Sequence, residues 1–391
     1  MARARRPLYN AEIMRLASVS AVFLALLASC AQEDLVTVRM ASLAGAGGAV
    51  QATTDPALKN VLVRNGTHRY CGAAPTFALA PDRVAGLVHV GAGGYEVRSL
   101  DEGIMLSRLD TCDDAPAVLV EPAGWTMWWS GGNEGGDRIY RACSADGYLW
   151  TGADAVLVPS EFTQDARPRD AVHTSAPAVL CLRDTYHMYY AGTAGGTVDN
   201  EIFLALSPDG VTWIKYSADG TPAFPTPVIP NTEPDGTYGL GHPSALVKDD
   251  TVYLYFTSRR RGASGLFLAT STDGIRFGPP RRVAADIENA DVKYCPALDV
   301  FFMVYGEVGD RYIFFNVSPD GLQWLPHDRA RTIATGGPES VHHSPAVAAD
   351  GRGHMRPQAR VFYAGGLHSG AALAPESWEI ESSWVEILRR P

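Results

Sequence analysis

A short motif, Ser-x-Asp-Gly, occurs four times in this sequence, each time with an aromatic residue three positions after the glycine. The aspartates of successive copies, at positions 146, 209, 273 and 320, are 63, 64 and 47 residues apart. Such spacing is typical of a β-propeller, in which each four-stranded blade buries its faces only against neighbouring blades. The copies are Ser144-Ala145-Asp146-Gly147 with Trp150, Ser207-Pro208-Asp209-Gly210 with Trp213, Ser271-Thr272-Asp273-Gly274 with Phe277, and Ser318-Pro319-Asp320-Gly321 with Trp324.

Two strand-like segments precede each copy. The first combines a proline with small apolar residues, and the second is rich in aromatic residues. A fifth pair follows the last copy, and residues 372–380 resemble a degraded copy of the motif. We therefore predict an all-β, five-bladed propeller over residues 105–391. The first segments begin at Ala115, Ala176, His242, Cys295 and Ser344, and the second begin at Met127, Met188, Tyr253, Phe302 and Val361.

Turn chemistry and composition agree with this prediction. Asp-Gly allows positive φ at a hairpin or bulge, and the serine side chain can bond nearby backbone amides. The chain has 39 Gly, 26 Pro and 46% hydrophobic residues, which is typical of a turn-rich globular protein with a large core. We expect the aromatic residue of each motif to pack between blades.

The N-terminus has the pattern of an export signal. Four arginines within residues 1–15 precede an apolar run over residues 16–27, which is short for a membrane span. The run ends in Leu27-Ala28-Ser29-Cys30, which resembles the lipobox of bacterial lipoproteins. The resemblance implies a signal peptide over 1–29 and a lipidated Cys30, and it favours the outer membrane if the organism has one. An ordinary signal peptide or an uncleaved anchor is the alternative.

The region after Cys30 shows no repeat. We expect a tether over residues 30–60, which includes a Gly/Ala-rich stretch, and a short irregular N-terminal extension over 61–104. One strand of this extension is predicted either to complete the fifth blade or to cap the first.

Without residues 1–29, which hold four Arg and one Glu, the chain has 33 − 4 = 29 basic and 43 − 1 = 42 acidic residues, a net charge of −13. An acidic protein is an unsuitable partner for nucleic acid. We expect neutral ligands or cations, a monomer, and contact with the cell envelope membrane through the lipid anchor only.

Five cysteines follow Cys30, so at least one thiol is free, and no Cys-x-x-Cys spacing indicates a metal site. Export permits disulfides. Candidate pairs are Cys143 with Cys181 and Cys71 with Cys112, and we expect Cys295 to be a buried structural thiol.

Strand order locates a candidate site. The start of each inner strand and the end of the strand beside it lie on the same face of a propeller, where pockets open at the axis. These positions are largely polar, which favours a site there, although a solvated loop explains any one of them. The candidates are Asp113, Asp114, Ser175, His242, Lys293, His342 and His343 at the inner strands, and Glu134, Asp137, Arg259 and Glu307 after the second strands.

Together these features resemble the five-bladed propellers of glycoside hydrolase families 43 and 32, over about residues 105 to 390. The resemblance implies inner-strand carboxylates in blades one, two and three, because glycoside hydrolysis needs one group to protonate the leaving oxygen and another to activate water or attack carbon. In this chain Ala115, Ala178 and Gly241 occupy those three positions, and Asp114 precedes the first.

Blade five retains more of the pattern. Val341-His342-His343-Ser344 resembles the family's Gly-His-Asn-Ser, whose histidine lies near the axis and in some members beside calcium or its waters. The resemblance thus implies His342 as a metal candidate; otherwise no cofactor is required.

Three functions follow from the resemblance, all with carbohydrate as the partner. The first is hydrolysis, with Asp114 as base or nucleophile and Glu307 or Glu134 as acid. The second is a non-catalytic surface glycan-binding lipoprotein. The third is a glycoside phosphorylase in which Arg259 and its two neighbouring arginines hold phosphate, although these arginines are equally explained as a solvated loop.

Overall fold

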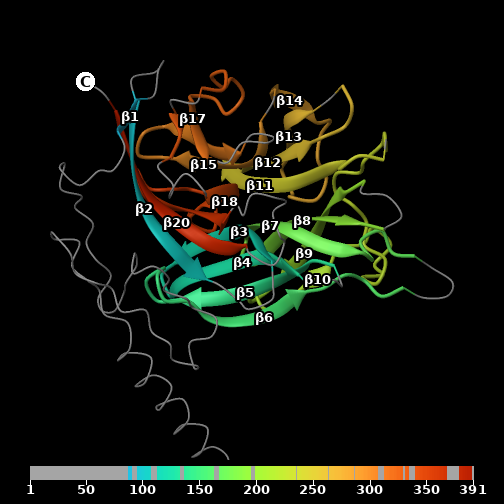
Figure 1. Ribbon diagram of the computed structural model, residues 1–391. Helices are drawn as coiled ribbons and strands as arrows, with labels where there is room; N and C mark the ends of the chain where they lie inside the picture. The colour runs from blue at the N-terminus through green and yellow to red at the C-terminus, as the bar shows by residue number, and fades with distance from the viewer. Residues whose placement is uncertain are drawn as a thin grey trace, which may run out of the picture. The chain divides into compact units, whose positions relative to one another are not determined.

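The computed structural model describes residues 87–89, 95–106, 112–132, 136–162, 167–194, 199–234, 236–262, 264–285, 287–306, 312–328, 331–333, 340–367 and 378–389. Within these ranges the chain forms five antiparallel sheets, which confirms the predicted all-β, five-bladed propeller (Figure 1). The described residues include no helix long and apolar enough to cross a membrane.

Four blades follow one another in chain order. Blade one consists of β3 (Cys112–Glu121), β4 (Gly124–Gly132), β5 (Arg138–Ser144) and β6 (Thr151–Leu157). Blade two consists of β7 (His173–Leu182), β8 (Thr185–Thr193), β9 (Glu201–Ser207) and β10 (Ile214–Lys215). Blade three consists of β11 (Leu240–Lys248), β12 (Thr251–Ser258), β13 (Gly265–Ser271) and β14 (Arg281–Ala284). Blade four consists of β15 (Glu288–Cys295), β16 (Val300–Gly306) and β17 (Phe314–Ser318).

Blade five combines both ends of the described chain. It contains β18 (Ser340–Val347), β19 (Gln358–Leu367) and β20 (Glu379–Arg389), followed by β2 (Tyr95–Leu106) and β1 (Leu87–His89). β2 runs antiparallel to β20, beside which it lies in Figure 1. Of the two alternatives for the N-terminal extension, the structure therefore shows completion of the fifth blade. Pairing of β2 covers the edge that β20 would otherwise expose.

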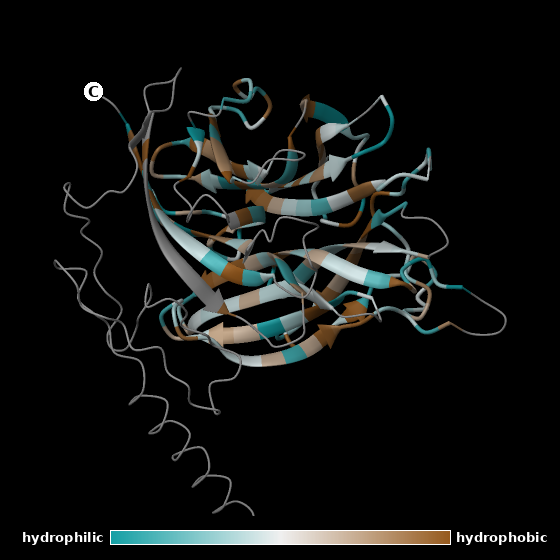
Figure 2. Cartoon of the chain, in the orientation of Figure 1, coloured by the Kyte–Doolittle hydropathy of each residue, from teal (hydrophilic) through white to brown (hydrophobic). Residues whose placement is uncertain are grey.

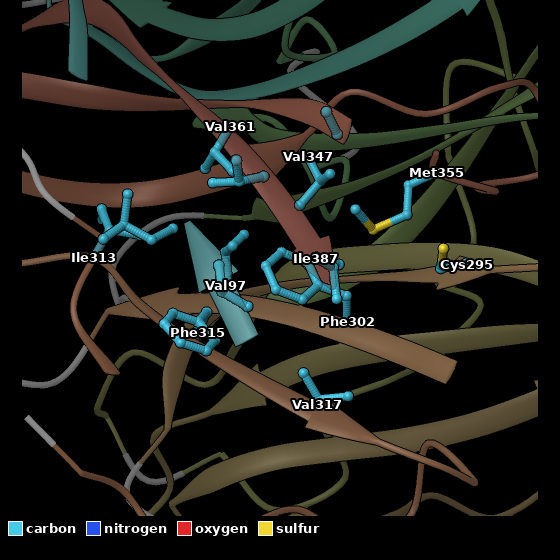
Figure 3. Packing of buried hydrophobic residues seen from close by; sticks show 14 of the residues in the cluster. Val97, Cys295, Phe302, Ile313, Phe315, Val317, Val347, Met355, Val361 and Ile387 are labelled. Atoms are coloured by element: carbon cyan, nitrogen blue, oxygen red, sulfur yellow. The ribbon is translucent and has the colours of Figure 1, made fainter. Parts of the chain in front are cut away.

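The core lies between the sheets, and Figure 2 shows apolar residues recurring along the strands. In the cluster of Figure 3, Val97 of β2 lies with Ile387 of blade five and with Phe302 and Phe315 of blade four. Full burial of such a side chain stabilises the fold by about 1.5–3 kcal/mol. The closing strand is thus held by apolar packing as well as by its backbone pairing.

The Ser-x-Asp-Gly turns connect neighbouring blades. In the second copy Ser207 Oγ accepts the Gly210 amide at 2.8 Å, and Asp209 Oδ1 accepts the amides of the next two residues at 2.9 and 2.8 Å. The Gly210 carbonyl is then left to accept Trp128 Nε1 of blade one at 3.1 Å. The other copies have equivalent bonds to the preceding blade: Tyr189 Oη to Gly274 O, Tyr255 Oη to Gly321 O, and Arg360 Nη1 to Gly147 O.

The aromatic residue of the motif packs against the same neighbouring blade. Trp213 makes an edge-to-face contact with Trp128 at 6.2 Å between ring centroids, and Phe277 makes one with Tyr189 at 5.8 Å. Trp150 contacts Phe362 of blade five in the same manner. These contacts agree with the expected packing between blades.

Each inner strand has a bulge at one residue with positive φ. The φ angle is 47° at Ala115, 50° at Ala176, 45° at His242, 48° at Asn289 and 49° at Ser344. The pairing register shifts at the same place in every blade. The residues directly before the five bulges, including Asp114 and His343, therefore have equivalent positions in their blades.

The bulges correct the sequence alignment of blade four. The sequence repeat equated Cys295-Pro296 with the starts of the other inner strands, but β15 ends at Cys295, and Pro296 lies in the turn to β16. The equivalent residues are Glu288 and Asn289, followed by alanine in place of proline. Lys293 therefore lies within the strand beyond the bulge, not before it.

Residues 348–355 close the opposite end of the axis; we call them the plug. Their backbone carbonyl groups accept hydrogen bonds from the inner strands of all four remaining blades. Four plug carbonyl oxygens accept backbone amides: Ala349 O accepts Val120 N at 2.7 Å, Gly351 O accepts Cys181 N at 2.7 Å, Arg352 O accepts Val247 N at 2.8 Å, and Gly353 O accepts Tyr294 N at 3.1 Å. One segment of blade five thus holds the ends of the other four inner strands together.

Gly353→Ala is expected to destabilise the protein strongly. Gly353 has φ of +72°, and a Cβ there would lie 2.8 Å from Ala245 O and from Leu246 Cα, which are backbone atoms. We expect the free energy of unfolding to fall by about 3 kcal/mol or more, from backbone strain plus overpacking. Gly220→Ala is the matched control, because Gly220 has φ of +80° and open space around it, so only the strain of about 1–2 kcal/mol applies. Equal losses in denaturant unfolding would contradict this role of the plug.

The predicted Cys143–Cys181 disulfide is wrong, because both are free thiols in the structure. The other candidate pair is not described, since Cys71 lies outside the described residues. Cys295 is buried as expected, and burial raises the pKa of its thiol.

Candidate functional site

Polar and charged side chains gather at the axial end opposite the plug. They come from blades one, three, four and five, because the inner strands or their neighbours begin or end there. Their charges influence one another's pKa values, so they lie close together. We call this group the rim cluster: Asp114, Asp137, Tyr238, His242, Arg259, Glu288 and His343.

Asp114 and His343 contact each other between blades one and five. Asp114 Oδ1 lies 3.2 Å from His343 Nδ1, and the two side chains are 26% and 27% exposed. The His343 ring also makes an edge-to-face contact with Trp378 at 3.9 Å. Burial lowers the pKa of His343, while the Asp114 carboxylate opposes that shift. Asp114 is therefore an oriented carboxylate that a ligand can reach.

His342 is buried beside this pair. Its Nε2 lies 3.1 Å from Glu381 Oε2, and its ring contacts Tyr363 edge to face. Its Nδ1 is buried and has no hydrogen-bond partner among the described residues. His342 is thus held by blade five itself and supports the strand that carries His343.

Blades three and four contribute a stacked group. The Tyr238 and His242 rings are nearly parallel, with centroids 6.0 Å apart, and the Arg259 guanidinium lies 4.7 Å from the Tyr238 ring. Arg259 Nη2 contacts Glu288 Oε2 at 2.5 Å. Burial raises the pKa of Glu288, and Arg259 opposes the shift. Arg259 is therefore already paired with a carboxylate.

Asp137 lies at the boundary of blades one and two. Its backbone carbonyl accepts the Thr174 amide at 3.0 Å. Nearby, His173 Nε2 lies 2.7 Å from Asn200 Oδ1. Burial raises the pKa of Asp137; the charge of His173 lowers it and that of Asp114 raises it.

An ion pair lies along the axis beyond the rim. An axial cavity is lined by small residues of blades one and two, such as Ala117 and Ala178, and by Asp291 and Lys293 of blade four. Lys293 Nζ lies 2.5 Å from Asp291 Oδ1, and both residues are buried. Asp291 also accepts Ser244 Oγ and the Val347 amide, each at 2.7 Å. Asp291 therefore joins blades three, four and five.

The residues present do not fit the metal that the resemblance implied at His342. In the part of the chain that the structure describes, no three His, Cys, Asp or Glu side chains are arranged to bind a metal ion. His342 Nε2 is engaged by Glu381, and the axial carboxylate Asp291 is neutralised by Lys293.

The other sequence candidates are placed as follows. Asp113 is fully buried and accepts Trp129 Nε1 at 2.7 Å, so it stabilises the blade. Ser175 is half-buried at the blade-two position equivalent to Asp114. Glu134, Glu307 and Cys30 lie outside the described residues.

The sequence pattern did not indicate three contributors: Tyr238, Glu288 and Trp378. Glu288 was hidden by the misaligned blade four. Asp137 follows the aromatic strand of blade one and was among the positions that strand order indicated, but its neighbours in space were not predictable. Tyr238 belongs to a connecting segment without a repeat. Trp378 lies in the degraded copy of the motif over residues 372–380, which did not indicate its contact with His343.

A pH effect follows from His242. Burial lowers the pKa of this side chain to about 3, while Asp114 opposes the shift and Arg259 adds to it. In the unfolded chain His242 takes up a proton near pH 6.5, whereas in the folded chain it does not. The contribution of His242 to the free energy of unfolding is therefore fully present above pH 6.5 and is lost as the pH falls toward 3. Asparagine tolerates the positive φ at this position. We therefore expect the free energy of unfolding of the His242→Asn variant to fall less between pH 7 and pH 5 than that of the natural protein. Identical pH dependence in urea unfolding would contradict this.

No protein-family model and no curated protein matches the chain. Solved structures do match. The α-L-arabinofuranosidase PaAbf62A from Podospora anserina, solved with cellotriose, has a TM-score of 0.53 and 13% identity over 77% of this chain and 94% of its own. Zg3597, a family 117 glycoside hydrolase of Zobellia galactanivorans, has a TM-score of 0.51 and 12% identity over 71% and 85%. A Bacillus subtilis arabinanase has a TM-score of 0.50 and 14% identity over 70% and 94%. At these identities the likeness establishes the fold alone: a five-bladed propeller whose structural neighbours are glycoside hydrolases.

Proposed function

We propose that this protein hydrolyses glycosidic bonds of an oligo- or polysaccharide at the rim end of its axis. The observation that carries the proposal is the position of Asp114, a partly exposed carboxylate oriented by His343 within a cluster drawn from four of the five blades. Asp114 would serve as the base or the nucleophile, the roles that glycoside hydrolysis assigns to a carboxylate. The glycosidase-like fold supports a carbohydrate substrate.

A screen of residues 31–391 against aryl glycosides and plant and microbial oligosaccharides tests this. Release of sugar by the purified protein is the expected result. Binding detected by calorimetry, with no sugar released from any member of the panel, would replace hydrolysis by glycan binding.

Glycan binding without turnover is the second candidate. It is favoured by Ala178 and Gly241, which stand where the resemblance implies carboxylates of blades two and three. A fold that keeps its polar rim and lacks these groups can still hold a sugar. Phosphorolysis has less support, because Arg259 and Arg260 contact Glu288 and Glu233 rather than offering an unpaired anion site.

We also propose that Cys30 carries a lipid that anchors the protein in the bacterial cell envelope. Cys30→Ser is expected to move the protein from the membrane fraction to the soluble fraction and to abolish its labelling by a radioactive fatty acid. Ser29→Thr is a control that keeps the cysteine. Unchanged membrane association of the Cys30→Ser protein would instead indicate an uncleaved apolar anchor.

A further inference from the structure

The structure places a second carboxylate close to Asp114 within the same blade. Across the sheet, Asp114 of β3 pairs with Ser130 of β4, and Ser130 pairs with Ile139 of β5. Asp137 directly precedes β5 at the same end of the sheet. Only the end of β4 lies between the two aspartates. Their proximity also appears in the charge of Asp114 acting on Asp137.

The end of β4 is shaped to admit the Asp137 side chain. It consists of Gly131 and Gly132, so no side chain separates β3 from Asp137 there. A Cβ at position 132 would lie 2.8 Å from Asp137 Oδ1. Gly132 therefore leaves the room that the Asp137 carboxylate occupies.

The two aspartates have different surroundings. Asp114 is partly exposed and contacts His343. Burial is the largest effect on Asp137 and raises its pKa; His173 opposes this shift, and the charge of Asp114 adds a smaller effect in the same direction as burial. A carboxyl group whose surroundings favour its protonated form, close to a second carboxyl group that a ligand can reach, is the usual arrangement of a catalytic acid and its partner. His173, held by Asn200, lies on the side of Asp137 that faces blade two.

We propose that Asp137 is the general acid of this site, with Asp114 as its partner. The inference rests on the proposed hydrolysis. Asp137 donates its proton to the glycosidic oxygen as the bond from that oxygen to the anomeric carbon breaks, so the leaving group departs as a neutral alcohol. In the case where Asp114 is the base, it takes a proton from water while the water oxygen bonds to the anomeric carbon. Glutamates 134 and 307 are not needed for this step.

The test compares leaving groups. A dinitrophenolate leaves without protonation, whereas an alkoxide does not. Asp137→Asn is therefore expected to lower kcat/KM by about 10²–10⁴-fold on an oligosaccharide or alkyl glycoside and by less than about tenfold on the dinitrophenyl glycoside. It should also remove the fall in kcat/KM at high pH, because that fall reflects loss of the acid's proton. Asp114→Asn should lower both rates.

Gly132→Ala provides a second variant, since it displaces the Asp137 carboxylate while keeping it. It should reproduce the leaving-group dependence in weaker form. Asp154→Asn, an exposed carboxylate on β6 of the same blade, is the control and should change neither rate.

The outcomes are distinct. Turnover by the natural protein, with equal losses on both substrates or no loss in Asp137→Asn, would overturn the acid role and leave the proposed hydrolysis standing. Absence of turnover on every glycoside would overturn both.

Discussion

Asp114→Asn is expected to lower kcat/KM for glycoside hydrolysis by about 10²–10⁴-fold or more, on activated and unactivated substrates alike. The amide keeps the shape of the carboxylate and can still accept the Ala115 amide, but it can neither take a proton from water nor attack the anomeric carbon. Initial rates on a dinitrophenyl glycoside, with the unfolding midpoint measured in parallel, check the prediction.

Asp154→Asn serves as control, because it removes the same charge from the same blade at the outermost strand. A variant at position 114 that retains full activity and stability would remove Asp114 from the mechanism. Retained glycan affinity together with lost turnover is the expected pattern.

Lys293→Met is expected to cost about 3–5 kcal/mol of unfolding free energy, because it leaves the buried Asp291 carboxylate without its counter-charge. Asp291 would keep Ser244 Oγ and the Val347 amide, which are neutral donors. Adding Asp291→Asn to Lys293→Met should restore part of the loss. Denaturant unfolding of the two single variants and the double variant measures the coupling.

Lys248→Met is the matched control. Lys248 also contacts an aspartate, Asp249, at 3.0 Å, but that aspartate is 86% exposed, so the change should stay below about 1 kcal/mol. The natural protein should show no change in Tm with added calcium or with EDTA, since Lys293 already neutralises the axial carboxylate. A calcium-dependent rise in Tm would contradict this assignment of the axial charge.

Several features were predictable because their causes are local. In the Ser-x-Asp-Gly turns, every bond that shapes the turn joins residues at most three positions apart, as between Ser207 and Gly210. The aromatic residue that follows must be buried, and in a repeated blade the adjacent blade is the surface available. The pattern therefore predicted strands, turns and blade number correctly.

Blade four shows where the pattern misled. The repeat was recognised by its proline, yet the shared feature of the five inner strands is a bulge residue with positive φ. Asn289 adopts that conformation without a following proline, whereas Pro296 follows the strand and has a different role. Backbone conformation is only partly encoded by residue type, so Glu288 was missed and Lys293 was placed at the rim.

Periodicity and turn chemistry were enough to predict the all-β class, the five blades and the end of the axis at which polar residues such as Asp114 gather. The contacts within the site are visible only in the folded chain: Asp114 with His343, Arg259 with Glu288, and Asp137 beside Gly132. The same is true of β2, which completes blade five, and of residues 348–355, which close the axis. These contacts join residues far apart in the chain, which approach one another only when all five blades close into a ring.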